Sequence, residues 1–414
     1  MKTMTKILTA SFFCICIFFA CSSDDTNNKV PQDKAKPIDI RSGFDEKLKQ
    51  DNNFAFDLLK TTNKYNNKPN LFISPLSVSM ALNMTLNGAN GETREEMLTA
   101  LRVNGYNVDE INEYSKTLRE ALINIDPSSV FTMANSIWYK LNLSVKSNFI
   151  ETNRTNYNAE IKEVDFLNPN TLKQINSWCA YNTNNKIPKV LDYIPGNAVM
   201  YLINAIYFKG IWKYEFDKKD TRKEIFTNSN QQKQEVQMMK QNSSLYYSAD
   251  SNCQYLELPY GNEAFSMVLM LPHENRTTDD IIDNLNSKTW NSALSGMRER
   301  KINLELPRFK TEGNYGLHEK ILPEMGMKRA FGADADFSNI ADDMSLAISR
   351  IIHKTMVEVN EEGSEAAAVT VVEIFESTGI VKPEFKVNKP FLFAIKEKST
   401  GVIIFIGKIG EIEQ

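Results

Sequence analysis

The residue types that most often carry out catalysis are few and scattered in this chain. Its three histidines, His273, His318 and His353, lie far apart, and scattered histidines are more often structural than catalytic. The chain has no HExxH zinc motif, no GxSxG nucleophile motif and no phosphate-binding loop. We therefore expect a protein that is not an enzyme and that needs no metal ion or other cofactor.

One cysteine lies in a sequence context that predicts its covalent modification. Two lysines precede an apolar run from about Ile7 to Ala20, which is too short to span a bilayer and has the form of a signal peptide. The run ends in a small residue followed by Cys21, and this resembles the cleavage box of bacterial lipoproteins, although the leucine usual there is absent. The resemblance implies thioether lipidation of Cys21 and removal of residues 1–20. An ordinary signal peptide cut near Ala20 is the alternative.

A tether would join this lipid to the folded body. Residues 21–41 are rich in Ser, Asp, Asn, Lys and Pro and have little to bury, so we expect them to be disordered. The acidic residues shortly after Cys21 resemble surface-export signals of bacterial lipoproteins, and a solvated spacer is the alternative. We expect an exported lipoprotein of the outer membrane, displayed at the cell surface, that contacts the membrane only through its lipid anchor.

Composition and charge indicate what kind of protein residues 42–414 form. The chain of 414 residues has a net charge of -4 and no basic block, so nucleic acid is not an expected partner. No internal repeat and no Pro/Gly/Ser linker divides residues 42–414, which favours one large domain. The two cysteines of this body, Cys179 and Cys253, could pair or remain buried free thiols.

The order of the predicted elements favours the α+β class. Ser74 and Pro75 suit the start of a helix, because serine can cap free N–H groups and proline fits the first helical position. Residues 201–208 and 266–272 form apolar runs of strand length, and residues 391–409 have the pattern of a hairpin. Helical patterns crowd the first half and strand patterns come after them, without regular alternation.

Several spaced motifs, in one order from about residue 42 to the end, resemble those of the serpin family of protease inhibitors. They are residues 70–82 with 88–93, 175–187, 204–221, 353–363 and 405–409. Asn185 stands where serpins usually carry glycine, which is a minor departure. The resemblance implies the serpin fold: one large α+β domain with about three β-sheets, and an exposed reactive loop at about residues 361–387.

The matched motifs also imply site residues. At the start of the loop the resemblance implies a hinge formed by Glu361, Glu362, Gly363, Ser364, Ala366, Ala367, Ala368 and Thr370. Beneath the main sheet it implies a polar cluster, the shutter, formed by Ser74, Ser77, Asn204 and His353. Where the loop first enters the sheet it implies a breach residue, Trp212. For the shutter, the alternative is a static hydrogen-bonded cluster. For Trp212, the alternative is an ordinary core aromatic residue. Independently, an asparagine inside an apolar strand requires a hydrogen-bond partner.

The residue pattern of the loop suits insertion into a sheet as a strand. Gly363 lacks the Cβ that restricts rotation, small residues come after it, and residues 369–372 are β-branched. One face of such a strand would carry only small or apolar residues, namely Ser364, Ala366, Ala368, Thr370, Val372 and Ile374. A slip by one residue would bury Glu365 and Glu373, so the pattern defines the register. A solvated helix or a surface loop is the alternative, because residues 365–368 are good helix formers.

The loop also contains candidate bonds for a peptidase. Counting fourteen residues from Gly363, as in most serpins, places the reactive bond between Ser377 and Thr378. An alternative reactive bond lies between Phe375 and Glu376. Counting back from the motif at Asn388–Phe391 would instead place the bond after residue 379.

The residues around these bonds indicate the class of target peptidase. The small Ser377 suits an elastase-like or broad-specificity enzyme, and Phe375 suits a chymotrypsin-like one. Papain-like peptidases and subtilisins remain alternatives. The nearest basic residue, Lys382, is followed by Pro383, so we expect weak or no trapping of trypsin-like enzymes.

The resemblance thus implies a monomeric suicide inhibitor that traps serine endopeptidases covalently, with cysteine endopeptidases as an open alternative. It would act by cleavage of the reactive loop and insertion of that loop into the main sheet. A non-inhibitory serpin that serves as a binding or transport module is the alternative function.

Overall fold

The computed structural model describes residues 33–40, 43–342, 346–364 and 383–413. The helices of this part are α1 (Asp45–Tyr65), α2 (Pro75–Leu86), α3 (Gly91–Ala100), α4 (Val108–Ile123), α5 (Ser147–Tyr157), α6 (Pro169–Asn182), α7 (Thr278–Asn284), α8 (Ser287–Gly296) and α9 (Ile321–Glu324). A short 3-10 helix lies at Arg329–Phe331. Every described helix longer than ten residues lies before residue 183, which confirms that helices gather in the N-terminal half.

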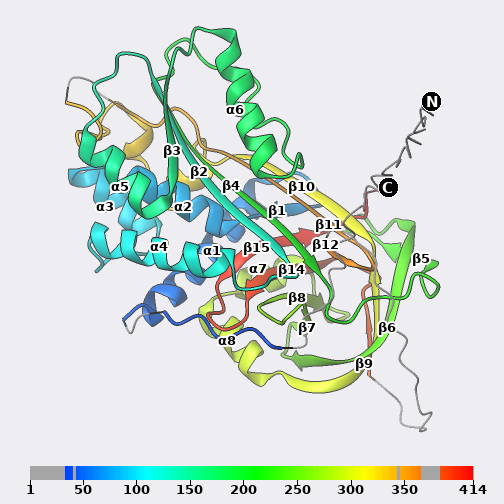
Figure 1. Ribbon diagram of the computed structural model, residues 1–414. Helices are drawn as coiled ribbons and strands as arrows, with labels where there is room; N and C mark the ends of the chain where they lie inside the picture. The colour runs from blue at the N-terminus through cyan, green and yellow to red at the C-terminus, as the bar shows by residue number, and fades with distance from the viewer. Residues whose placement is uncertain (1–32, 41–42, 343–345, 365–382, 414) are drawn as a thin grey trace, which may run out of the picture.

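Six strands form one sheet, which we call the main sheet, in the order β10-β11-β12-β4-β2-β3. They are β2 (Val130–Lys140), β3 (Ala159–Val164), β4 (Met200–Ile211), β10 (Phe309–Gly316), β11 (Ile352–Val359) and β12 (Gly363–Ser364). In Figure 1 this sheet runs diagonally through the molecule, with α2 to α5 gathered at one end of it and β5 beyond the other.

The remaining strands form a second network in the order β1-β15-β14-β8-β7-β6-β9-β13, with β5 also paired to β6. They are β1 (Leu71–Ile73), β5 (Arg222–Thr227), β6 (Lys233–Ala249), β7 (Cys253–Pro259), β8 (Phe265–Pro272), β9 (Arg298–Pro307), β13 (Glu384–Lys386), β14 (Phe391–Glu397) and β15 (Ile403–Ile409). We expected about three sheets, and the described strands form two hydrogen-bonded networks because β6 is long. It pairs with β5 at its start and with β7 at its end, and so joins two parts into one.

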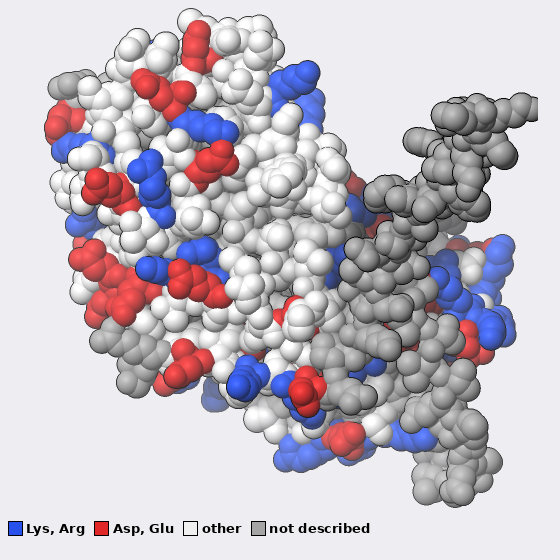
Figure 2. Space-filling model, in the orientation of Figure 1, with Lys and Arg blue, Asp and Glu red and all other residues white. Residues whose placement is uncertain are grey.

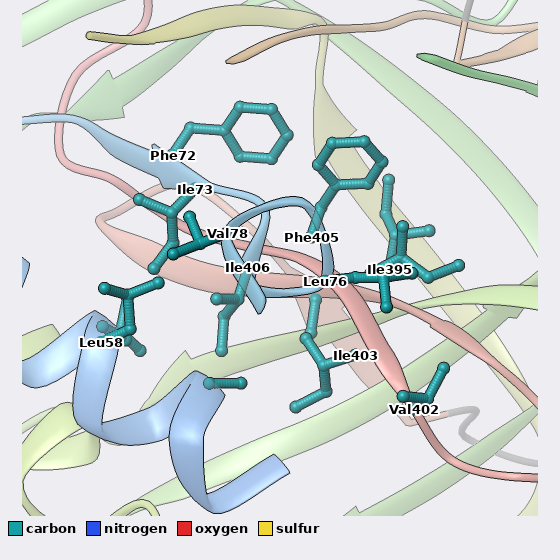
Figure 3. Packing of buried hydrophobic residues seen from close by; sticks show 14 of the residues in the cluster. Leu58, Phe72, Ile73, Leu76, Val78, Ile395, Val402, Ile403, Phe405 and Ile406 are labelled. Atoms are coloured by element: carbon teal, nitrogen blue, oxygen red, sulfur yellow. The ribbon is translucent and has the colours of Figure 1, made fainter. Parts of the chain in front are cut away.

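The core lies between the two sheets, where α2 packs against β4 of the main sheet and against β15 of the second network. Figure 3 shows its centre, where side chains of α1, β1 and α2 meet those of the C-terminal hairpin. Phe72 stacks on Phe405 with ring centroids 5.4 Å apart, and both rings are almost completely buried. The burial of such aromatic rings is a large apolar contribution to stability.

Helix α2 begins where the sequence predicts. The Ser74 side chain accepts a hydrogen bond from the Ser77 N–H, and Pro75 occupies the first helical position, where no N–H is needed. The apolar runs predicted as strands are β4 and β8, and β8 is buried along its whole length. The predicted C-terminal hairpin is β14 paired with β15.

The final residues of the predicted tether contact the body. The Ala35 N–H donates to the Asn262 carbonyl (2.9 Å), the Ile38 N–H donates to Ser399 Oγ (2.9 Å), and Lys34 pairs with Glu263 (3.2 Å). Ala35, Ile38 and Ile40 pack against the core. Residues 33–40 therefore form a strap against the body, because three small or branched apolar side chains among the polar ones are partly buried there.

The described helices include none that is both long enough and apolar enough to cross a membrane. On the face drawn in Figure 2, acidic and basic side chains are interspersed around a broad uncharged centre.

We predict that Cys179 and Cys253 do not form a disulfide. Both are free and buried in the structure, and burial raises the pKa of each thiol to about 12, so reactive thiolate is scarce. In a chain that begins after Cys21, a thiol reagent should modify neither residue in the native state and both after unfolding. Mass spectrometry would count the adducts, and an unreactive pair in the unfolded protein would contradict the prediction.

Candidate functional site

The start of the predicted loop is already part of the main sheet. Gly363 and Ser364 form β12, which pairs antiparallel with Gly210 and Ile211 of β4 and, through Ser364, with Val359 of β11. Among the described residues, β4 and β11 share no ladder of their own. Within the described part of the chain, the strand position between β4 and β11 is therefore occupied by Gly363 and Ser364 alone.

The residue two positions before β12 is a buried carboxylate. Glu361 is 2% exposed, and its carboxylate receives hydrogen bonds from the Arg308 guanidinium (2.6 to 2.8 Å) and one from the Thr221 hydroxyl (2.5 Å). Burial alone would raise the pKa of Glu361, but the bonds from Arg308 and Thr221 hold this pKa below the usual glutamate value. Glu361 thus remains charged and holds the hinge to two other segments.

The next residue is fixed in a similar way. The Glu362 carboxylate forms an ion pair with Lys218. The hydrogen bond that Lys218 donates to Glu362 raises the pKa of this lysine. The Glu362 carbonyl accepts a hydrogen bond from the Trp212 N–H (2.8 Å), and the Glu361 carbonyl accepts one from the Phe216 N–H (3.0 Å). The hinge is therefore held by its backbone as well as by its two charged side chains.

Glycine is required at position 363 for two reasons. Gly363 has φ +151°, a conformation that L side chains rarely adopt. A Cβ atom at this position would also lie 2.0 Å from the Gly210 carbonyl oxygen. The sequence alone indicates free rotation at this glycine, and the close approach to the β4 backbone is a further reason that only the structure reveals.

Trp212 lies at the end of β4, directly beside the hinge. It is 1% exposed, its indole N–H donates to the Asn360 carbonyl (2.9 Å), and its ring stacks on Tyr260 with centroids 4.3 Å apart. The Tyr260 hydroxyl in turn contacts Ser364 Oγ at 2.8 Å, and burial raises the pKa of Tyr260 well above its usual value. Ser364 thus points into the core, as the predicted alternation requires.

Three of the four predicted shutter residues are in direct contact. His353 Nε2 accepts a hydrogen bond from the Ser74 N–H (2.9 Å), and the Ser74 hydroxyl donates to the Ile404 carbonyl (2.8 Å) and accepts from the Ser77 N–H (3.3 Å). His353 is buried, and this burial lowers its pKa to about 4. The imidazole is therefore neutral at physiological pH.

Asn204 lies across a cavity from these residues. Its amide donates to Asn135 Oδ1 (2.7 Å), so the required partner is an asparagine of β2. Asn204 Oδ1 is buried and accepts no hydrogen bond from the described part of the chain. Ser77, Asn204 and His353 all line the cavity, whose volume is about 130 Å³ and which lies between α2, β4 and β11. The cavity is thus lined by a residue whose buried acceptor has no donor among the described residues.

Part of the predicted site lies outside the described residues. The hinge residues Ala366, Ala367, Ala368 and Thr370, both candidate reactive bonds at Ser377-Thr378 and Phe375-Glu376, and the lipidation residue Cys21 belong to this group. Their roles remain predictions.

The partners of the hinge were not predicted from the sequence. Arg308 binds Glu361, Lys218 binds Glu362, and the members of each pair are more than fifty residues apart in the sequence. Tyr260, directly after β7, contacts Ser364. The signal that could have indicated such partners is the pair of adjacent glutamates itself, because a buried carboxylate needs a cation or several hydrogen-bond donors. Nothing in a single sequence says which cation is used.

Comparison with known proteins identifies the class that this fold and site define. Residues 49–412 match the family described as serpin (serine protease inhibitor), and the chain belongs to that family. Iripin-8 of Ixodes ricinus is 33% identical over 96% of this chain and 98% of its own length. Human serpin B3 is 33% identical over 86% of this chain and 96% of its own length.

Solved structures agree with this family and with the α+β serpin fold. The thermophilic serpin tengpin in its native state superposes with a TM-score of 0.83 at 33% identity, over 92% of this chain and 97% of tengpin. A thyroxine-binding globulin in complex with thyroxine superposes with a TM-score of 0.80 at 27% identity, over 89% of this chain and all of the globulin chain. The fold therefore occurs both in a family of protease inhibitors and in a protein that binds a small molecule.

We predict that Gly363→Ala displaces the hinge from the main sheet. The added Cβ would meet the β4 backbone and the residue would keep a strained φ, at a cost of about 1–3 kcal/mol. The urea midpoint of the native protein should fall accordingly, monitored by the fluorescence of tryptophan.

Gly196→Ala is the matched control for this change, because a Cβ at Gly196 would meet no atom within 4 Å. It should leave the midpoint unchanged. Equal urea midpoints for Gly363→Ala and the wild type would show that β12 does not pair with β4 as described.

We predict that acid destabilises the folded protein through His353. Its folded pKa is about 4, whereas an unfolded histidine titrates near 6.5. Between these values the unfolded state binds a proton that the folded state does not. The contribution of His353 is therefore fully present above about pH 6.5 and is lost as the pH falls toward 4. Urea unfolding should show a loss of up to about 1.4 kcal/mol per pH unit in this range.

His353→Gln should reduce this pH dependence, because glutamine can still accept the Ser74 N–H but does not titrate. His273→Gln removes a histidine that lies outside the shutter, and it should retain the wild-type dependence on pH. The prediction fails if wild type and His353→Gln lose stability equally between pH 6.5 and 4.

Proposed function

We propose that this protein is a suicide inhibitor that traps serine endopeptidases covalently through its loop. A peptidase would attack the loop as a substrate and form an acyl-enzyme. The freed loop would then enter the main sheet as a strand between β4 and β11 before the ester is hydrolysed. About 14 residues at roughly 3.3 Å each would carry the attached peptidase some 45 Å.

The observation that carries this proposal is the position of β12. Two residues of the loop already lie between β4 and β11, and the neighbouring strands are not paired with each other beyond them. A loop that continued this strand would add a ladder on both sides without separating an existing ladder first. The cavity beside Asn204 and His353 lies along that path, and the inward residues of the predicted register are small or apolar.

Trapping requires that displacement damages the peptidase faster than the ester hydrolyses. Loss of one oxyanion donor slows deacylation by about 10²–10³-fold, so a modest distortion of the catalytic site would preserve the ester. The small residue at Ser377 favours elastase-like or broad-specificity targets, and Phe375 favours chymotrypsin-like ones. Papain-like enzymes are a further class to test.

A lipid anchor would place this inhibitor at the cell surface. The support is in the sequence, where a signal-like apolar run leads to Cys21 and a polar segment comes after it. We infer that the chain is an outer-membrane lipoprotein that shields surface proteins from external peptidases. Replacement of Cys21 by serine should release the protein from the membrane fraction, and continued membrane attachment would contradict the inference.

A non-inhibitory binding role is the second candidate, since the same fold occurs in a thyroxine-binding globulin in complex with thyroxine. The two functions differ in the effect that loop cleavage has on stability. Insertion would raise the melting temperature of the cleaved protein sharply, whereas a loop that cannot insert would leave it nearly unchanged.

We predict that Thr370→Arg converts the inhibitor into a substrate, whereas Val371→Arg does not. In the predicted register Thr370 faces the interior of the sheet and Val371 faces outward, so only the first change buries a charge. Wild type and Val371→Arg should form a complex with an elastase-like peptidase that survives a denaturing gel. Thr370→Arg should be cleaved with at least a tenfold lower yield of complex.

The same gel, run with elastase-, chymotrypsin-, subtilisin-, trypsin- and papain-like peptidases, identifies the target class. Mass spectrometry of the released C-terminal peptide identifies the bond, and a peptide that begins at Thr378 is expected. Clean cleavage of the wild type by every peptidase without any complex would overturn the proposed function. A stable complex with the trypsin-like enzyme at near one-to-one stoichiometry would overturn the predicted specificity.

A further inference from the structure

The first residues that the structure describes are attached to the body beside the hinge. The strap at residues 33–40 donates hydrogen bonds to Asn262, in the turn between β7 and β8, and to Ser399, in the turn between β14 and β15. Lys34 forms an ion pair with Glu263 of the first turn (3.2 Å). Lys34 therefore marks the point where the preceding segment of the chain leaves the body.

The same turn between β7 and β8 also contacts the hinge. The Tyr260 hydroxyl contacts Ser364 Oγ (2.8 Å), and the Gly261 N–H donates to the carbonyl of Ile211, the last residue of β4 (2.9 Å). Tyr260 and Glu263 are three positions apart, which is at most about 11 Å of extended chain. The strap is therefore attached at the end of the main sheet where β12 pairs with β4, which we call the hinge end.

One buried carboxylate holds three segments together at the hinge end. Glu263 is 6% exposed and pairs with Lys34 of the strap, with Lys213 shortly after β4 and with Lys398 shortly after β14. Burial alone would raise the pKa of Glu263, but the hydrogen bonds from these lysines lower it to about 2. The carboxylate is therefore ionised at physiological pH, and the strap is held by charge as well as by its backbone.

The opposite end of the main sheet, which we call the far end, lies where β2 and β3 finish. β4 runs between the two ends from Met200 to Ile211, and at roughly 3.3 Å per residue it spans about 36 Å. At the far end the Leu141 N–H, directly after β2, donates to the carbonyl of Val164, the last residue of β3 (2.8 Å). Leu167 comes shortly after β3 and is 76% exposed. A segment that leaves the body at the hinge end thus starts a full strand length away from the far end.

The predicted lipid anchor is close to the hinge end along the chain. Lys34 comes 13 positions after Cys21, which is at most about 45 Å of extended chain. A flexible chain of about 13 residues has a root-mean-square reach on the order of 20 Å. To place the far end against a bilayer, the segment would have to span about 36 Å, which is close to full extension and costs chain entropy. No such extension is needed when the hinge end faces the bilayer.

We propose that the hinge end of the main sheet faces the phospholipid bilayer in which the lipid anchor is inserted. The proposal rests on the lipid anchor of the proposed function, and it assigns to the strap the role of fixing this orientation. With the strap attached, the anchor and the body are 13 positions apart in sequence, at Cys21 and Lys34. With the strap detached, they are 23 positions apart, at Cys21 and Phe44 before α1.

This orientation limits the size of the peptidases that reach the loop. The described start of the loop, Gly363 and Ser364, lies at the hinge end and therefore on the side of the bilayer. A peptidase of about 230 residues is on the order of 40 Å wide, which is about the full length of the extended segment between Cys21 and Lys34. The gap therefore admits a compact single-domain peptidase and hinders larger ones.

The test measures energy transfer from the full lipidated chain to acceptor-labelled lipid in phosphatidylcholine vesicles. The donor dye is attached to Lys219→Cys, beside the lysine that pairs with Glu362 at the hinge end, or to Leu167→Cys at the far end. Both sites are exposed, whereas Cys179 and Cys253 are buried. Transfer should be at least about twofold more efficient from the hinge end. Equal transfer, more efficient transfer from the far end, or failure of the wild type to remain on the vesicles overturns the proposal.

Lys34→Glu combined with Ile38→Asp should release the strap, because the first change repels Glu263 and the second places a charge in a partly buried site. The difference in transfer between the two dye sites should then fall to less than about half. Lys36→Glu combined with Pro37→Asp is the matched control, since it changes the net charge equally at two exposed residues of the strap. It should keep the wild-type difference, and an unchanged difference in the released variant overturns the proposal.

Trapping of an elastase-like peptidase is measured separately, with the anchored wild type and with the Cys21→Ser chain in solution. A bulky carrier joined to the peptidase should slow trapping about tenfold on vesicles and much less in solution, and equal slowing would contradict the size limit. If neither chain traps the peptidase but the dyes report the expected orientation, the proposal stands and the inhibitory function fails. If trapping occurs and the two dye sites transfer equally, the inhibitory function stands and this proposal fails.

Discussion

A strand position in the main sheet that the described residues fill only with β12 is the constraint on which the rest of this structure depends. β4 and β11 are neighbours in the main sheet only through the two residues of β12, and beyond Ser364 the described parts of their facing edges share no ladder. Backbone N–H and C=O groups without ladder partners are costly when buried and are templates for another strand when exposed. Under the proposed function, the inserted loop would gain hydrogen bonds on both sides of this position.

Two ion pairs hold the hinge immediately before β12. Glu361 and Glu362 are buried carboxylates, and each is neutralised by a cation that belongs to a different segment of the chain, Arg308 or Lys218. Breaking either pair would leave a buried charge without compensation, which is far more costly than the loss of an exposed ion pair. In the predicted register, the residues after Ser364 place only small or apolar side chains on the inward face. Under the proposed function, the two ion pairs would therefore hold the chain before the point where the inserted strand begins.

The fold and much of the site could be predicted from the sequence wherever the determining interactions are local. The cap at Ser74, the buried run of β8 and the C-terminal hairpin depend on neighbours in sequence, and all three are present as predicted. The bidentate contact of Arg308 with Glu361, the partner of Asn204 on β2 and the close approach of Gly363 to β4 depend on tertiary placement, and composition does not indicate them. The strap at residues 33–40 escaped prediction because three apolar side chains among polar ones are a weak signal.

The two ends of the loop are held in different ways, and this difference determines which end would move. At the C-terminal end, Phe385 and Val387 are fully buried, β13 pairs with β9, and Lys386 lies in a ring of four alternating charges. Hydrogen bonds from Lys240 and Lys386 keep the pKa of Glu224 in this ring below its usual value, so the ring stays charged. At the N-terminal end, Gly363 and Ser364 are the loop residues in the described part of the chain that pair with the main sheet. Under the proposed function, the N-terminal side would enter the sheet after cleavage while β13 remains in place, and this direction would carry an acylated peptidase away from its site of attack.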